Sequence, residues 1–264
     1  MRDRWLRWGS GAAFALLAAP AAHGQAIEKQ PDARAQIRHA ASVKREGRGL
    51  QGEARMTHLR RVASAYEAVL ANFPDSREEC SEASFRLGET LRTLADWDAA
   101  VAAFARVVEI GASPRWAARA LLETGNVHRR AKEMAKAIEA YGRVVAEFPQ
   151  ERSVRDDAYL WMGKVHATMR EWDPARSAFT KVAEEGEDPV DRIQAFDQIA
   201  LSYLQEGKTI EATASIERCK TLFAEIADEP TRQGARVKKA LSRMRSVTRA
   251  AEETADGVDP AMER

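Results

Sequence analysis

The hydrophobic pattern of the chain repeats four times in register. Segments that begin at Ala83, Ala120, Ala158 and Ala195 align without internal gaps, and their starts lie 37 or 38 residues apart. Within each segment, matched apolar residues lie three or four positions apart, which places them on one face of a helix. A short polar turn divides each segment in two. The pattern therefore predicts four helix–turn–helix units and an all-α fold.

Three positions of each unit describe how its two helices pack. A small residue lies in the middle of the first helix, a second small residue faces it from the second helix, and a large residue follows four positions later. These residues are Gly88, Ala100 and Phe104 in the first unit; Gly125, Ala137 and Tyr141 in the second; Gly163, Ala175 and Phe179 in the third; and Ala200, Ala212 and Ile216 in the fourth. The small residues predict a close approach of the two helices.

This set resembles the tetratricopeptide repeat, which has a small residue at its eighth position, Ala at its twentieth and an aromatic residue at its twenty-fourth. The family period is about 34 residues, whereas here it is 37 or 38. Because the spacing within the repeat is unchanged, the extra residues are expected after the second helix, as a longer second helix or a longer inter-repeat turn. The resemblance implies a right-handed superhelical solenoid whose first helices line a concave surface.

Weaker patterns flank the four repeats. Tyr66 to Ser76 matches the segment around Tyr141 and indicates a degenerate fifth unit, and glycines at 47, 49 and 52 separate helices expected at about 32–45 and 53–72. Downstream, an apolar stripe predicts a capping helix for the last repeat. The expected organisation is a signal peptide at 1–24, N-terminal helices with the degenerate repeat at 25–78, four repeats at 79–230, the capping helix at 231–253 and a disordered tail at 254–264.

The N-terminus has the three-part pattern of a secretory signal peptide. Basic residues precede an apolar stretch at 11–22 that is too short to span a bilayer. Cleavage is expected after Gly24 or, as a second choice, after Ala21, and the alternative is an uncleaved anchor. No Cys lies near this point, so the protein is expected to be periplasmic or secreted and not a lipoprotein. The aromatic-plus-Phe-Pro ending at 66–74 is similar to that of envelope tetratricopeptide proteins of Gram-negative bacteria.

The charge balance gives no overall attraction to nucleic acid. The chain has 41 Lys plus Arg and 40 Asp plus Glu, so no nucleic-acid partner is expected for this exported protein. Cys80 and Cys219 fall at opposite ends of the expected solenoid, and a disulfide requires Cα atoms within about 7 Å of each other. The two residues are therefore expected to be buried thiols rather than a bridge.

The family's groove positions mark a candidate binding surface on the first helices of the second and third repeats. The resemblance assigns to this groove Arg119, Leu122, Asn126, Arg129, Arg130, Leu160, Trp161 and Lys164. Trp161 with the two leucines would form an apolar floor. The basic rim would favour a protein or peptide partner with acidic side chains or a free C-terminal carboxylate. Only Asn126 matches the Lys and Asn arrangement of chaperone-binding members. The alternatives are that Trp161 packs within the solenoid and that the arginines form an ordinary solvated face.

The chain shows no motif of catalysis or cofactor binding. It lacks the glycine-rich loops of nucleotide-binding proteins, the serine elbow of hydrolases and the zinc-binding helix of metalloproteases. His128 and His166 occupy equivalent positions in neighbouring repeats, but no Cys or carboxylate completes a metal site, so packing roles are expected for both. We therefore expect no enzyme activity, no cofactor and no metal.

The repeats and the signal peptide together predict an exported protein–protein interaction scaffold or adaptor of the bacterial cell envelope, which holds its partner in the concave groove. The first alternative is an envelope structural protein. Residues 231–251 carry seven Lys or Arg and no acid, so this helix forms either a solvated cap or a contact with anionic glycan or lipid. The second alternative is a subunit that supports an envelope enzyme or a secretion machine.

Overall fold

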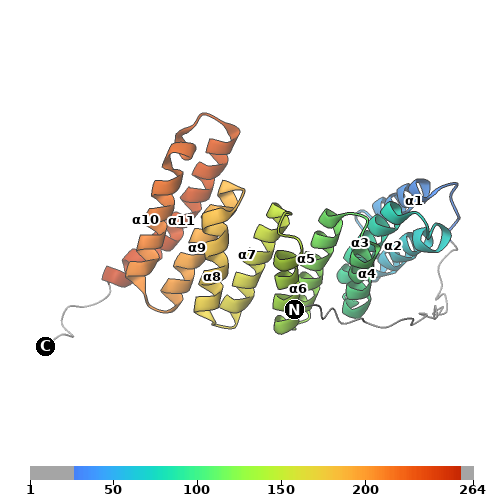
Figure 1. Cartoon of the computed structure of the whole chain (residues 1–264), viewed down its shortest axis with the longest axis horizontal. Coiled ribbons are helices and arrows are strands. Elements are labelled where there is room, and N and C mark those ends of the chain that lie inside the picture. The colour runs from blue at the N-terminus through green and yellow to red at the C-terminus, as the bar shows by residue number, and fades with distance from the viewer. Residues whose placement is uncertain (1–26, 257–264) are drawn as a thin grey trace, which may run out of the picture.

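The computed structural model describes residues 27–256, with side chains described up to residue 244, and contains eleven helices and no strand in that range (Figure 1). The helices are α1 Ala33–Glu46, α2 Gly52–Asn72, α3 Arg77–Thr93, α4 Trp97–Ile110, α5 Pro114–Arg130, α6 Met134–Glu147, α7 Arg152–Thr168, α8 Trp172–Glu185, α9 Pro189–Gln205, α10 Thr209–Asp228 and α11 Arg232–Asp256. The predicted all-α class is confirmed. The predicted signal peptide at 1–24 lies outside the described residues.

The helices form hairpin pairs that stand in one row, from α1 and α2 at one end to α10 and α11 at the other (Figure 1). Each helix packs against the next one in the chain. In addition, the first helices α3, α5, α7 and α9 contact one another from repeat to repeat, whereas the second helices α4, α6 and α8 contact only their chain neighbours. The first helices therefore line the inner side of the superhelix, and the second helices lie on its outer side, as the resemblance implies.

Each of the first three repeats is closed by a ring of the second helix that lies directly on the glycine of the first. Tyr141 and Phe179 are fully buried. A Cβ atom added at Gly125 would lie 2.3 Å from Tyr141 Cε1, and one at Gly163 would lie 2.5 Å from Phe179 Cε1. The predicted close approach is confirmed, and the group that requires the glycine is the ring rather than the facing alanine.

The extra residues of the repeat lengthen the first helix. All four first helices have 17 residues, whereas α4, α6 and α8 have 14. The expectation of a longer second helix or a longer inter-repeat turn is therefore wrong for these repeats. In α5 and α9 the early start follows from Pro114 and Pro189, because proline fits the first helical turn without losing a hydrogen bond. Among the second helices of the four repeats, only α10 is longer, with 20 residues.

The flanking helices complete the row. α1 and α2 lie in the predicted ranges, and the break between them includes the glycines at 47 and 49. At the other end, Thr231 Oγ1 accepts a hydrogen bond of 3.0 Å from the backbone N–H of Gly234 and so caps the start of α11. α11 ends at Asp256, three residues into the predicted tail at 254–264, and the rest of that tail lies outside the described range.

The last helix covers the apolar end of the solenoid. α11 packs against α9 and α10, and its Val237 and Met244 side chains are buried in the same cluster as Cys219 and Phe223. Cys219 Sγ lies 3.6 Å from Met244 Sδ, and burial raises the pKa of this thiol to about 12. Cys80, in α3, is likewise a buried free thiol, so the prediction of two unbridged cysteines is confirmed.

Candidate partner-binding groove

A pocket of about 440 Å³ opens on the inner side of the solenoid, between α3, α5 and α7. Its lining residues come from α3, from α5, from the start of α7 with its preceding turn, and from the turn before α9: Phe85, Glu89, Arg115, Arg119, Leu122, Glu123, Gln150, Glu151, Arg152, Ser153, Val154, Asp157 and Glu187. Apolar side chains and charges of both signs thus face the same hollow, as they do on protein-binding surfaces.

At one wall of this pocket, an arginine side chain lies against two aromatic rings. The rings of Phe85 and Trp116 meet edge to face with centroids 4.9 Å apart. The guanidinium carbon of Arg119 lies 5.8 Å from the Trp116 ring centroid and 6.0 Å from that of Phe85. Arg119 is exposed and forms no ion pair within the part of the chain that the structure describes. The wall therefore combines a rigid apolar base with an available positive charge.

A second cluster joins α5 to α7. The guanidinium carbon of Arg129 lies 4.3 Å from the Trp161 ring centroid, and Lys164 Nζ lies 4.5 Å from it. All three side chains are half-buried. Burial lowers the pKa of Lys164, with nearby Asp157 acting in the opposite direction and Arg129 adding to the decrease. Two cations thus share one indole in a partly dehydrated setting.

The other four predicted groove residues differ in their exposure to solvent. Arg130 is exposed, whereas Leu122, Asn126 and Leu160 are buried. Asn126 Oδ1 accepts a hydrogen bond of 2.9 Å from the Tyr141 hydroxyl, so this amide is committed to the interior of its repeat. Leu160 belongs to the core cluster around α8 and α9. The predicted apolar floor therefore reduces to Trp161 and the edge of Leu122, which also lines the pocket.

The sequence-based groove missed the residues at the start of the first helices. Arg115 lies in the first turn of α5, and Arg152 and Val154 lie in the first turn of α7, yet all three line the pocket. They belong to the stretch that holds the extra residues of the repeat. Because those residues were expected after the second helix, this stretch was not expected in the groove. The prolines at the start of α5 and α9 are the sequence signal that would have placed it in the first helix.

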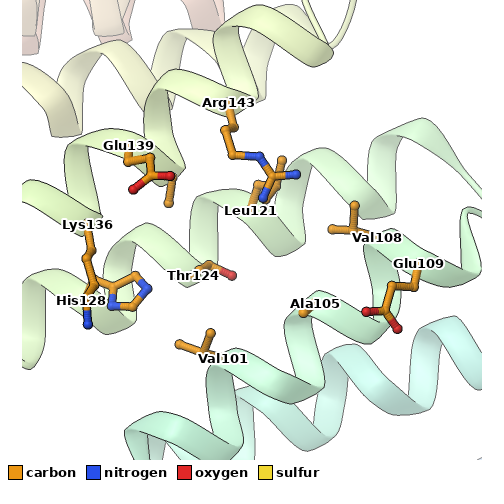
Figure 2. Close-up of a pocket in the computed structure, with 11 residues that line it drawn as sticks. Val101, Ala105, Val108, Glu109, Leu121, Thr124, His128, Lys136, Glu139 and Arg143 are labelled. Atoms are coloured by element: carbon orange, nitrogen blue, oxygen red, sulfur yellow. The ribbon is translucent and has the colours of Figure 1, made fainter. Parts of the chain in front are cut away.

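A second hollow, of about 330 Å³, lies on the outer side between α4, α5 and α6 (Figure 2). Its apolar lining includes Val101, Val108 and Leu121, and charged side chains surround it. Two of the rim cations are already paired: Lys136 Nζ lies 2.7 Å from Glu133 Oε1, and Arg143 Nε lies 2.7 Å from a carboxylate oxygen of Glu147. The outer hollow therefore offers less unpaired positive charge than the inner one.

The two histidines brace the turns of their repeats. His128 Nδ1 lies 2.7 Å from Glu133 Oε2, and His166 Nδ1 lies 2.6 Å from Glu171 Oε2. Each pair spans the turn between a first and a second helix, and its carboxylate belongs to the residue just before the second helix. No cluster of His, Cys, Asp or Glu suited to a metal occurs among the described residues. The structure thus gives both side chains a structural partner.

Comparison with known proteins agrees with this architecture. Tetratricopeptide-repeat models match residues 53–115 and, with a second model, residues 119–151 and 157–185. The chain is a tetratricopeptide-repeat protein. The first match begins in α2, so it takes in the second helix of the N-terminal unit but not α1. No curated protein matches the sequence.

Several solved structures share the fold. A crystal structure of the protein MamA is 22% identical, with a TM-score of 0.54 over 75% of this chain and 96% of that one. BtubC (BKLC) from P. vanneervenii is 14% identical, with a TM-score of 0.51 over 75% and 92%. A putative kinesin light chain from Podosopora anserina is 15% identical, with a TM-score of 0.52 over 74% and 97%. At these identities the likeness concerns the fold alone.

Membership of this family supports a protein–protein interaction scaffold, because stacked repeats present an extended concave surface for binding. The fold is typically a non-catalytic one. No helix in the described residues is both long and apolar enough to cross a membrane. The alternative contact of residues 231–251 with anionic glycan or lipid finds no support in the comparisons. Of the basic side chains described there, Arg236 is paired with Asp188 at 2.8 Å.

Proposed function

We propose that this tetratricopeptide-repeat protein is an exported adaptor of the bacterial cell envelope, which binds a partner protein on the inner side of its solenoid. The observation that carries the binding surface is the pocket between α3, α5 and α7, with exposed Arg119 at its wall. The basic and apolar pattern at the N-terminus supports export. The protein acts by holding its partner rather than by chemistry on it.

The binding surface is tested by photo-crosslinking in living cells. Arg119 is replaced by a photoreactive phenylalanine analogue, and a matched variant carries the analogue at Arg106, an exposed position on the outer helix α4. We expect one dominant protein adduct from position 119 and none from position 106, both identified by mass spectrometry. Equal adducts from the two positions, or adducts from 106 alone, would place the contact elsewhere and contradict the proposal.

Export is tested on the same protein. We expect the mature chain to begin at Gln25, or at Ala22 for the second cleavage site, when its N-terminus is sequenced from the periplasmic or secreted fraction. Replacing Leu16 and Leu17 with arginine interrupts the apolar stretch and should leave the chain unprocessed inside the cell. Recovery of the wild-type chain at full length in the cytoplasm alone would refute the exported role.

A further inference from the structure

The interface between the first and second repeats and the interface between the second and third repeats differ at one matched pair of residues. Arg92 of α3 forms an ion pair with Glu123 of α5. One repeat later the equivalent arginine is Arg129 of α5, and the residue equivalent to Glu123 is Trp161 of α7. The carboxylate that receives the first arginine is therefore replaced by an indole in the second interface.

This replacement leaves positive charge without an internal carboxylate. Neither Arg129 nor Lys164 forms an ion pair within the described residues. Arg129 Nε is buried and has no hydrogen-bond acceptor. A buried donor without an acceptor is costly to the protein. In addition, the charge of Arg129 lowers the pKa of Lys164, so the two cations repel each other. That repulsion falls if an external anion takes the place of the missing carboxylate.

The groups of the protein that lie nearest to Arg129 and Lys164 do not take the place of the missing carboxylate. Burial raises the pKa of the Tyr141 hydroxyl to about 12, and a hydrogen bond with Arg129 and the charge of Arg129 act against this increase, so the internal partner of the arginine is a neutral hydroxyl and not a carboxylate. The charge of Asp157 acts to raise the pKa of Lys164, but the two side chains form no ion pair among those of the described residues. The two cations therefore remain open to an anion that reaches them from the inner side.

We propose that Arg129, Lys164 and Trp161 form a binding site for a carboxylate of an acidic segment of the partner protein. This inference rests on the proposed function and names the chemistry that its groove selects. The external carboxylate accepts hydrogen bonds from the Arg129 guanidinium and the Lys164 ammonium group, as the Glu123 carboxylate does from Arg92. Leu122, at the edge of the neighbouring pocket, provides apolar contact for a side chain next to the acid in the peptide.

The first test measures binding of defined peptides to the full mature chain. The probe is a short peptide of alternating Leu and Glu with acetylated and amidated ends, and its control has Gln for every Glu. A third peptide is the Gln version with a free C-terminal carboxylate. Binding is followed by the indole N–H signals in NMR spectra and by fluorescence anisotropy at several salt concentrations. Tighter binding of the Glu peptide assigns the site to acidic side chains, and binding of the third peptide alone assigns it to a chain end.

Variants then locate the site. Arg129→Gln and Lys164→Gln should each weaken binding of the acidic peptide on the order of tenfold and reduce its salt dependence. Arg106→Gln removes the same charge from the outer side and should leave binding unchanged. Equal binding of the Glu and Gln peptides by the wild-type chain, or an equal loss in all three variants, would overturn the proposal.

Two matched substitutions at position 161 test the site most directly. Trp161→Glu recreates the Arg92–Glu123 arrangement, so an internal carboxylate should occupy Arg129 and abolish peptide binding. Trp161→Gln removes the indole without adding charge and should retain part of the binding. If Trp161→Glu bound the acidic peptide as tightly as Trp161→Gln does, the inferred site would be wrong. In that case adducts from position 119 alone would still support the groove, so the two proposals can fail separately.

Discussion

At the residue scale, the contact between a glycine and a ring decides how each repeat closes. In the second repeat Gly125 lies under the ring of Tyr141, whose hydroxyl donates to Asn126. The ring is fully buried, so it has no space into which it can retreat when the glycine gains a side chain. A steric contact of this kind is local, and for that reason it could be predicted from sixteen-residue spacing without knowledge of the superhelix.

Replacing Gly125 with alanine tests this contact. The added Cβ would lie 2.3 Å from Tyr141 Cε1, so the free energy of unfolding should fall by about 1–3 kcal/mol. Gly142 is the control, because it lies in the neighbouring helix and a Cβ there meets nothing within 4 Å. Gly142→Ala should raise stability by about 0.5–1 kcal/mol, since alanine favours the helix. Chemical denaturation measures both, and equal effects would contradict the steric explanation.

At the scale of elements, the early start of the first helices shapes the inner pocket. The last helix, α11, covers the C-terminal end of the solenoid. The early start of α5 and α7 brings Arg115 and Arg152 into the inner pocket. At the C-terminal end, α11 takes the place of the next first helix and covers Cys219 and Phe223. In a solenoid each unit is stabilised chiefly by its neighbours, so the fourth repeat depends on this cap.

The cap is tested by placing a charge in its buried face. Val237 is fully buried, and Val237→Asp should destabilise the protein by about 3 kcal/mol or more because an unpaired carboxylate enters the core. Lys238→Asp, at the exposed neighbouring position, should change stability by no more than about 0.5 kcal/mol. Hydrogen exchange should show the loss of protection first in α9 and α10. An equal loss of protection in all repeats would mean that α11 does not stabilise the fourth repeat in particular.

At the scale of the whole molecule, charge is balanced overall but not locally. The chain has 41 basic and 40 acidic residues, yet the Arg129–Lys164 pair carries positive charge without a paired carboxylate on the inner side. Because the first helices contact one another from repeat to repeat, whereas the second helices do not contact one another, residues on neighbouring first helices combine into one surface. The proposed adaptor function and the proposed selection of acidic segments both depend on that juxtaposition.

The sequence by itself determined the repeat, the all-α class and the small residues beneath the rings, because these depend on contacts between helices joined by a short turn. It also indicated Trp161, Arg129 and Lys164 as neighbours in one groove, through the family's positions. Only the tertiary structure decided that Leu160 and Asn126 are buried and that the first turns of α5 and α7 line the pocket. It alone showed Arg129 over an indole where Arg92 has a carboxylate. Those features depend on how one repeat is placed against the next, and that placement is set by packing between helices of different repeats.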